Sequence, residues 1–238
     1  MLGMGGSLST DPASLVFEDL TSYKDLAFYF KNKAGCSASG WTDSSVNGND
    51  MAQSSSGNQA GFVNQSLLFD GTDDHYDLTS AVSIGGSNRF TLFWVGMISD
   101  YANPSGFLGD GTQIGGLSTA EITFTSTSTI TARGRNGVDP QQFVVSSSPF
   151  VTRTLMVICI TKGALGAISV YKNGTLLTPD DAVSMSLAPF DVDTVGLVPD
   201  EESKLYKGYL YELALYEREL SSAEIYTVND YLIKKFGL

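Results

Sequence analysis

Acidic side chains crowd one short segment, DGTDDHYD at 70–77. It contains Asp70, Asp73, Asp74 and Asp77, and carboxylate oxygens are ligands that Ca²⁺ prefers in proteins. The segment is not an EF-hand, because the glutamate that closes such a loop is missing. The alternative, which we favour, is a β-turn in which Asp70 accepts hydrogen bonds from backbone N–H groups. These four aspartates are therefore the metal-binding candidates, with calcium as the candidate ion.

Carboxylates in a catalytic arrangement are harder to find. Sandwich-type glucanases carry an acid and a nucleophile on one strand, about 5–5.5 Å apart in retaining enzymes, and no Glu-x-Asp-x-Glu type of run occurs here. Asp191 and Asp193 would share a face of an extended strand, but no third carboxylate completes the set. The single histidine, His75, lies in the acidic segment, and no Gly-x-Ser-x-Gly elbow is present. We expect no enzymatic activity and no catalytic residue; a polysaccharide hydrolase or lyase is the less favoured alternative.

Aromatic residues in loop-like stretches could bind sugars. A sugar site needs an exposed ring beside a few polar groups, and Trp41, Tyr101 and Phe107 lie in or near such stretches. They are the ligand-binding candidates. Each could equally be a packing residue, since aromatic side chains dominate protein cores.

Composition excludes several classes of protein. With 14 Lys+Arg against 26 Asp+Glu the formal net charge is -12, and binding to a phosphate backbone requires clustered basic residues. We therefore expect no nucleic-acid partner. The two cysteines, Cys36 and Cys159, are too few for a disulfide scaffold, and we expect both to be small buried hydrophobic residues. The first residues lack the features of a secretory signal, and no apolar run approaches the roughly 20 residues of a membrane helix. We expect synthesis in the cytoplasm and no membrane insertion.

Most of the chain follows a period of two residues. Residues 121–133 alternate threonines with Ile, Phe, Ser and Ala, which is typical of strands with one buried face. Residues 90–98 are apolar on both faces and predict a central strand. Asn173-Gly174 separates two β-rich runs and suits a type I′ hairpin. The pattern predicts an all-β, two-sheet antiparallel sandwich or barrel.

The C-terminus departs from this pattern. Ser221 and Glu224 fit a capping box, and a helical stripe of apolar residues follows, which predicts one amphipathic helix over 222–236. The first residues are rich in Gly and Ser without a sustained period. We therefore expect an N-terminal extension over 1–24, with residues 1–16 as a possible docking segment, and one domain over 25–238.

Four blocks of sequence resemble laminin-G-like, concanavalin A-like jelly-roll domains. The blocks are SLLFDGTDDHYDL at 66–78, the closing run LYKGYLYELALYERELSSAEI at 205–225, the hairpin ISVYKNGTLL at 168–177, and GWTDSSVNGNDMAQSSSGNQAGFV at 40–63. In the last block Val46 stands where a glycine is usual.

The resemblance implies a two-sheet jelly roll with the C-terminal helix at its side. Domains of this type bind glycans or proteins, sometimes with calcium, and stand-alone versions occur in bacteriophage structural proteins. The leading hypothesis is a non-enzymatic phage virion protein, in a capsid decoration or a tail fibre, with a lectin-like domain that binds host surface glycans. Its partners would then be other virion proteins, further copies of itself and the host glycan, and its location the virion. The alternative is a carbohydrate-binding adhesion module.

Overall fold

The structure is a computed structural model. It describes residues 19–84, 89–101, 105–111, 113–114, 117–118, 120–134, 141–185, 190–199 and 204–238. The predicted docking segment at 1–16 lies outside these residues.

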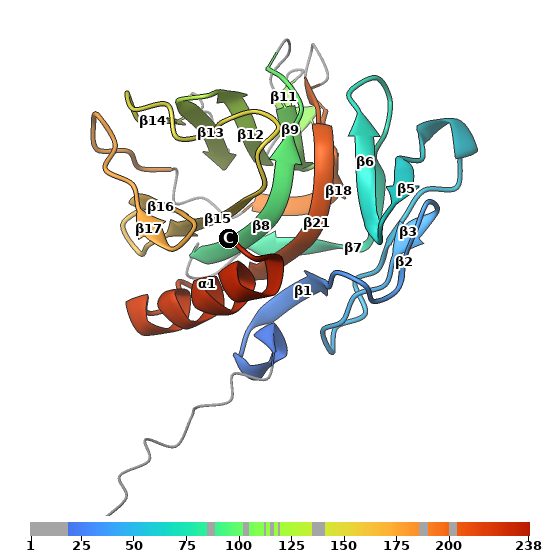
Figure 1. The fold of residues 1–238 in the computed structure, drawn as a ribbon, viewed down its shortest axis with the longest axis horizontal. Helices are drawn as coiled ribbons and strands as arrows, with labels where there is room; N and C mark the ends of the chain where they lie inside the picture. The colour runs from blue at the N-terminus through green and yellow to red at the C-terminus, as the bar shows by residue number, and fades with distance from the viewer. Residues whose placement is uncertain are drawn as a thin grey trace, which may run out of the picture.

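Two large antiparallel sheets pack face to face (Figure 1), as the alternating pattern and the resemblance predict. The eight-stranded sheet has the order β17-β16-β15-β8-β21-β6-β5, with β1 also paired to β21. Its strands are β1 (Leu26–Phe30), β5 (Gly61–Val63), β6 (Ser66–Asp70), β8 (Phe90–Ile98), β15 (Met156–Lys162), β16 (Ile168–Lys172), β17 (Thr175–Leu176) and β21 (Lys207–Tyr216).

The nine-stranded sheet has the order β14-β13-β12-β9-β18-β7-β4-β3-β2. Its strands are β2 (Cys36–Ser37), β3 (Gly40–Trp41), β4 (Met51–Ala52), β7 (Tyr76–Ile84), β9 (Ser105–Gly109), β12 (Ala120–Ser126), β13 (Thr129–Gly134), β14 (Gln141–Val144) and β18 (Phe190–Val195). The remaining elements are two short hairpins and two 3-10 helices: β10 (Gln113–Ile114) with β11 (Leu117–Ser118), β19 (Leu197–Val198) with β20 (Lys204–Leu205), η1 (Leu20–Ser22) and η2 (Ser56–Asn58).

The main core lies between the two sheets. Period-two alternation directs one face of each strand inward, so that Ile122, Phe124 and Ile130 from the threonine-rich hairpin are buried there. The predicted central strand is β8, which pairs with β15 on one side and β21 on the other. The Asn173-Gly174 turn joins β16 to β17, and both residues have the positive φ that a type I′ turn requires (46° and 77°).

The helix α1 (Ser222–Phe236) covers the outer face of the eight-stranded sheet. Its ends are those that the sequence predicts, with the reciprocal capping box between Ser221 and Glu224 present. Ile225, Val228 and Leu232 pack in a second core against side chains of β1, β8, β15 and β21. Both cysteines are free thiols: Cys159 is buried in this second core as expected, whereas Cys36 is only partly buried against the main core.

The N-terminal boundary of the domain lies earlier than residue 25. Leu20 is fully buried in the second core, and its carbonyl accepts a hydrogen bond from the Tyr216 hydroxyl at 2.7 Å. Asp19 forms an ion pair with Lys31 of the sheet-connecting segment. The predicted extension over 1–24 is therefore too long, because residues 19–24 are part of the packed domain. No helix among the described residues has the length and apolar character of a membrane span.

Candidate functional site

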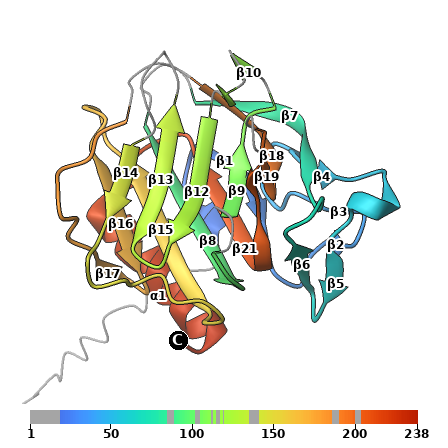
Figure 2. The same cartoon turned by 90° about the horizontal axis from the view of Figure 1, so that it is seen from above.

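The outer face of the nine-stranded sheet is polar and lies away from α1 (Figure 2). Because successive side chains of a strand point to opposite faces, the residues between the buried ones of each strand form this surface. On β12 and β13 the outward positions are threonines, but Thr123 and Thr131 are buried (0% and 5% exposed) and Thr125 is half-buried; the Thr125 and Thr131 hydroxyls lie 2.7 Å apart. On the other sheet, α1 packs against the outer side of β1, β8, β15 and β21.

The β19–β20 hairpin lies over the middle of this outer face. The approach is close: a Cβ on Gly106 would lie 2.7 Å from the Lys204 carbonyl oxygen, and one on Gly109 would lie 3.0 Å from that of Leu197. The Thr194 hydroxyl of β18 donates to the same Leu197 carbonyl at 2.9 Å. Because Gly106 and Gly109 of β9 have no side chains, the hairpin can pack directly on the sheet. The hairpin then separates the outer face into two halves.

One half, over β12 and β13, contains a buried ion pair. Lys204 of the hairpin donates from Nζ to Glu121 Oε1 at 2.6 Å, and the Thr123 hydroxyl donates to the same oxygen at 3.0 Å. Glu121 is 1% exposed, so its carboxylate is not accessible to a ligand. The ion pair instead holds the hairpin against the sheet.

The other half, over β7 and β18, gathers three carboxylates. Asp77 of β7 pairs in register with Thr194, while Asp191 and Asp193 come from the neighbouring strand. Asp77 and Asp191 are exposed. The pKa of Asp193 is raised, first by partial burial and then by the negative charges of Asp77 and Asp191; the Gly111 N–H, which donates to Asp193 Oδ1 at 2.5 Å, acts in the opposite direction.

Sequence reasoning found only part of this group. Asp191 and Asp193 are two residues apart on β18, and the alternation of a strand suggests a shared face. Asp77 joins them through the pairing of β7 with β18, two strands more than 100 residues apart in sequence, and no local pattern indicates which strands pair. Asp193 lies beside an irregularity in the register between Val192 and Thr194, so simple alternation does not describe it.

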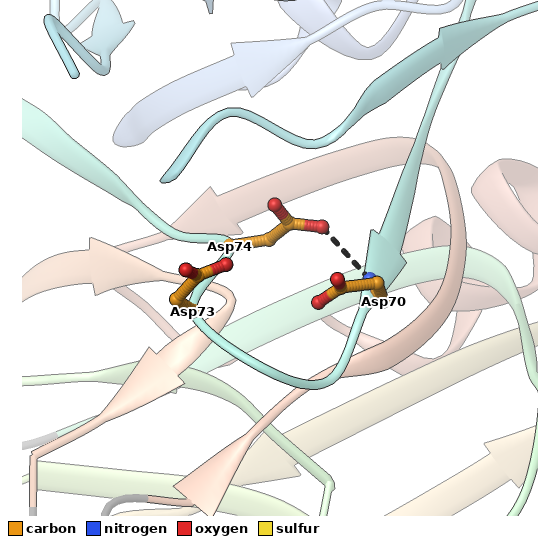
Figure 3. Close-up of side chains that lie close together, drawn as sticks. All are labelled: Asp70, Asp73 and Asp74. Carbon is orange, nitrogen blue, oxygen red and sulfur yellow. Dashed lines mark hydrogen bonds between the residues drawn. The ribbon is translucent and has the colours of Figure 1, made fainter. Parts of the chain in front are cut away.

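The acidic turn after β6 is a separate feature (Figure 3). Asp70, Asp73 and Asp74 direct their carboxylates toward one another, with ligand atoms all within 4.8 Å. Asp77 is not part of this group of described residues, because it lies on the outer face of the sheet. Of the four calcium candidates, the structure therefore brings three together.

The same turn shows the capping that we favoured from the sequence. The Thr72 N–H donates to Asp70 Oδ1 at 2.7 Å, and the Asp70 N–H donates to Asp74 Oδ2 at 2.8 Å. Burial raises the pKa of Asp74, and the charges of Asp70 and Asp73 add to this effect. Oxygen ligands of this kind suit Ca²⁺, and a carboxylate oxygen can accept a backbone hydrogen bond and still face an ion.

Two of the three aromatic candidates lie in the core, and the third is partly buried. Trp41 and Phe107 are 1% exposed, and the Trp41 indole N–H donates to the carbonyls of Lys31 and Ala34 at 3.1 and 2.9 Å. Tyr101 is partly buried against the main core, with its hydroxyl donating to the Phe150 carbonyl at 2.7 Å. A sugar cannot stack on the enclosed rings of Trp41 and Phe107, whereas Tyr101 stays a prediction. The sequence around Trp41 and Phe107 is loop-like, and it gives no local sign that these two rings point into the core.

Comparison with known families identifies the superfamily to which this fold corresponds. A family model described as the concanavalin A-like lectin/glucanases superfamily matches residues 70–226, more than half of the chain. No curated protein matches the whole sequence significantly.

Solved structures share the fold at low sequence identity. A Trypanosoma rangeli sialidase in complex with 2,3-difluoro-KDN superposes with a TM-score of 0.60 at 18% identity, over 90% of this chain and 33% of that one. The binding domain of Paraclostridial Mosquitocidal Protein 1 gives 0.61 at 15% identity, over 90% and 53%. The binding domain of Botulinum neurotoxin DC, in complex with rat synaptotagmin II, gives 0.57 at 13% identity, over 90% and 52%. The chain thus spans about a third to a half of the proteins that it resembles.

Proposed function

Because the chain belongs to the concanavalin A-like lectin/glucanases superfamily, we propose that it is a non-enzymatic carbohydrate-binding domain whose ligand lies on the outer face of the nine-stranded sheet. One observation carries the proposal: this face presents the carboxylates of Asp77, Asp191 and Asp193 beside the exposed Ser83, which pairs with Asp191, whereas α1 packs on the outer side of β1, β8, β15 and β21. Carboxylates and hydroxyls are hydrogen-bond acceptors and donors suited to sugar hydroxyls.

The similar structures support a binding role of this kind. One is a sialidase solved with sialic acid, and two are described as binding domains of toxins. These structures show that proteins with this sandwich include ones that bind glycans or partner proteins. The fold by itself does not determine function.

A second candidate, a glycan hydrolase, is favoured by one feature. A raised carboxyl pKa beside other carboxylates is the arrangement of a general acid, and Asp193 has it. Partial burial and the neighbouring charges of Asp77 and Asp191 explain the raised pKa of Asp193 without a catalytic role. Incubation with bacterial surface polysaccharides should release no new reducing ends and no unsaturated uronates; their appearance, and their loss in Asp193→Asn, would establish the hydrolase or lyase instead.

The virion assignment stays a prediction. Neither the fold nor the similar structures distinguish a phage structural protein from another carrier of this domain. If residues 1–16 dock the chain to a virion, their deletion abolishes incorporation into particles while the domain stays folded.

Binding to arrays of bacterial surface glycans tests the proposed function. We expect Asp77→Asn and Asp191→Asn each to weaken binding by about tenfold or more, because a hydrogen bond to a charged group contributes roughly 1.5–3 kcal/mol. Asp181→Asn is the matched control, since Asp181 is an exposed aspartate in a loop outside both sheets. Equal binding by all four proteins would exclude this face, and silence across a broad panel would count against a lectin.

A further inference from the structure

An apolar strip crosses the outer side of the eight-stranded sheet, beyond the end of α1. Tyr209 of β21 is in register with Leu68 of β6 on one side and with Met97 of β8 on the other. The residues next to each of them in sequence belong to the main core, so the alternation of a strand directs these three side chains outward. All three are half-buried, and they belong to neither core.

Two aromatic rings continue this strip toward the helix. The Tyr211 ring stacks on the Tyr209 ring with centroids 5.9 Å apart, and Phe236 of the last turn of α1 packs edge-on against Tyr211 at 6.1 Å. In Figure 1 the helix lies across the lower ends of β8 and β21, and their upper ends extend beyond it. The strip therefore runs from α1 across the part of the sheet that the helix leaves uncovered.

The charges at the border of the strip are nearly balanced. Lys207 Nζ lies 2.8 Å from Asp100 Oδ2, and these side chains are 44% and 40% exposed. Lys207 is also in register with the exposed Asp70 of β6, and at the helix end Lys235 Nζ lies 2.5 Å from Oε2 of the buried Glu212. Little of the formal net charge of -12 is therefore located at this border.

This distribution of charge fits a second copy of the same chain. Two molecules that each carry a charge of -12 repel one another, so they approach most easily where the local charge is small. Lys207 and Asp100 present opposite charges side by side, and a two-fold axis passing near them would place Lys207 of each copy next to Asp100 of the other. Tyrosine and methionine are also enriched at the centre of protein interfaces.

We propose that the strip of Leu68, Met97, Tyr209 and Tyr211 is the contact surface of a two-fold symmetric dimer of this chain. Interfaces that bury less than about 1,200 Å² in total are typical of weak complexes, and the strip is confined to the ends of a few strands, so the dimer dissociates on dilution. The strip and the proposed glycan face lie on opposite sides of the sandwich. Both glycan faces therefore stay accessible in the dimer, and failure of the dimer would leave the proposed function unaffected.

Sedimentation velocity of the full chain over a series of concentrations tests the dimer. We expect the weight-average mass to rise from that of one chain toward twice that value between about 1 μM and 1 mM, the range in which weak complexes form. A mass that stays at that of one chain throughout would overturn the proposal. A mass that rises past the dimer without levelling would also overturn it, because a two-fold contact closes on itself.

Variants within the strip locate the contact. Tyr209→Glu and Met97→Lys each place a charge at its centre and should weaken the dissociation constant by about tenfold or more, the factor that 1.4 kcal/mol represents. Met97→Lys gives a second measurement if Tyr209→Glu does not fold. Tyr226→Glu is the matched control, because Tyr226 is a 70% exposed tyrosine of α1 outside the strip. Undiminished association of folded Tyr209→Glu and Met97→Lys would overturn the assignment of this surface.

Charge reversal distinguishes a contact between copies from a contact within one chain. Lys207→Asp leaves acidic groups without a cation at this end of the strip, and Asp100→Lys leaves two cations together, so each variant alone should associate at least tenfold more weakly. A mixture of the two variants should associate again, because each then supplies the charge that the other lacks. Restoring an ion pair within one chain cannot have this effect. A mixture that associates no better than either variant alone would contradict the two-fold arrangement.

Discussion

Single charged residues stabilise particular contacts of the folded state. Glu224 is one example: it completes the capping box of α1 and also accepts two hydrogen bonds from the Arg218 guanidinium, at 3.0 and 2.7 Å. The hydrogen bond with Arg218 is the largest cause that lowers the pKa of Glu224, to about 2. The folded state therefore favours the ionised carboxylate.

The pH dependence of stability follows from that shift. A carboxyl with a depressed pKa in the folded state stabilises it above the unfolded value of 4.5, and the contribution is lost as the pH falls toward 2. We expect Glu224→Gln to lower the free energy of unfolding by about 1 kcal/mol at pH 7, as for other helix caps, and by progressively less between pH 5 and pH 2. Urea unfolding at several pH values measures this difference; a difference independent of pH would contradict the account.

The turn that holds Asp70, Asp73 and Asp74 should respond to calcium. Three carboxylates within 4.8 Å of one another repel, and the raised pKa of Asp74 reflects its burial and this repulsion. We expect millimolar Ca²⁺ to raise the melting temperature and Asp73→Asn to reduce that rise, with Asp181→Asn as control. Affinities of roughly 10⁻⁴–10⁻³ M are usual for weak extracellular calcium modules. Identical melting in Ca²⁺ and in EDTA would show that backbone capping alone holds the turn.

Among the elements, the β19–β20 hairpin shapes the candidate site most directly. It can seat on β9 only because Gly106 has no side chain, since a Cβ there would lie 2.7 Å from the Lys204 carbonyl oxygen and 2.8 Å from Val198 Cγ2. Forcing an added methyl group into a packed contact costs about 1–3 kcal/mol.

We expect Gly106→Ala to displace the hairpin and to speed amide hydrogen exchange at Val198 and Lys204, which pair with each other. Gly57→Ala is the control, because a Cβ at Gly57 meets nothing within 4 Å. Unchanged exchange in Gly106→Ala would mean that the hairpin is not held against the sheet.

Individual helices and strands were easier to predict from the sequence than the residues that gather at the candidate site. The helix and the central strand β8 were predictable because their signals, a capping box with a helical stripe and a run apolar on both faces, are local. The group of Asp77, Asp191 and Asp193 was not, because it depends on which distant strands pair. The burial of Trp41 and Phe107 was not predictable for a related reason: Trp41 lies in a short strand of the nine-stranded sheet, and its burial depends on what covers it.

The whole molecule is asymmetric in a way that suits binding on one face. The helix adds a second core to the eight-stranded sheet, whereas the nine-stranded sheet presents the exposed Asp77 and Asp191 outward. The net charge of -12 disfavours anionic ligands, so neutral glycans are expected to bind more tightly than sialylated or uronate-rich ones, and more so at low salt because screening is weaker there.

The central claim is that a glycan binds on the outer face of the nine-stranded sheet. The most direct measurement is a crystal structure of the chain with the glycan that binds most tightly on the array. We predict a bound glycan beside β7 and β18, with hydroxyls within hydrogen-bond distance of Asp77 or Asp191. A glycan bound only elsewhere on the chain, with this face empty, would contradict the claim.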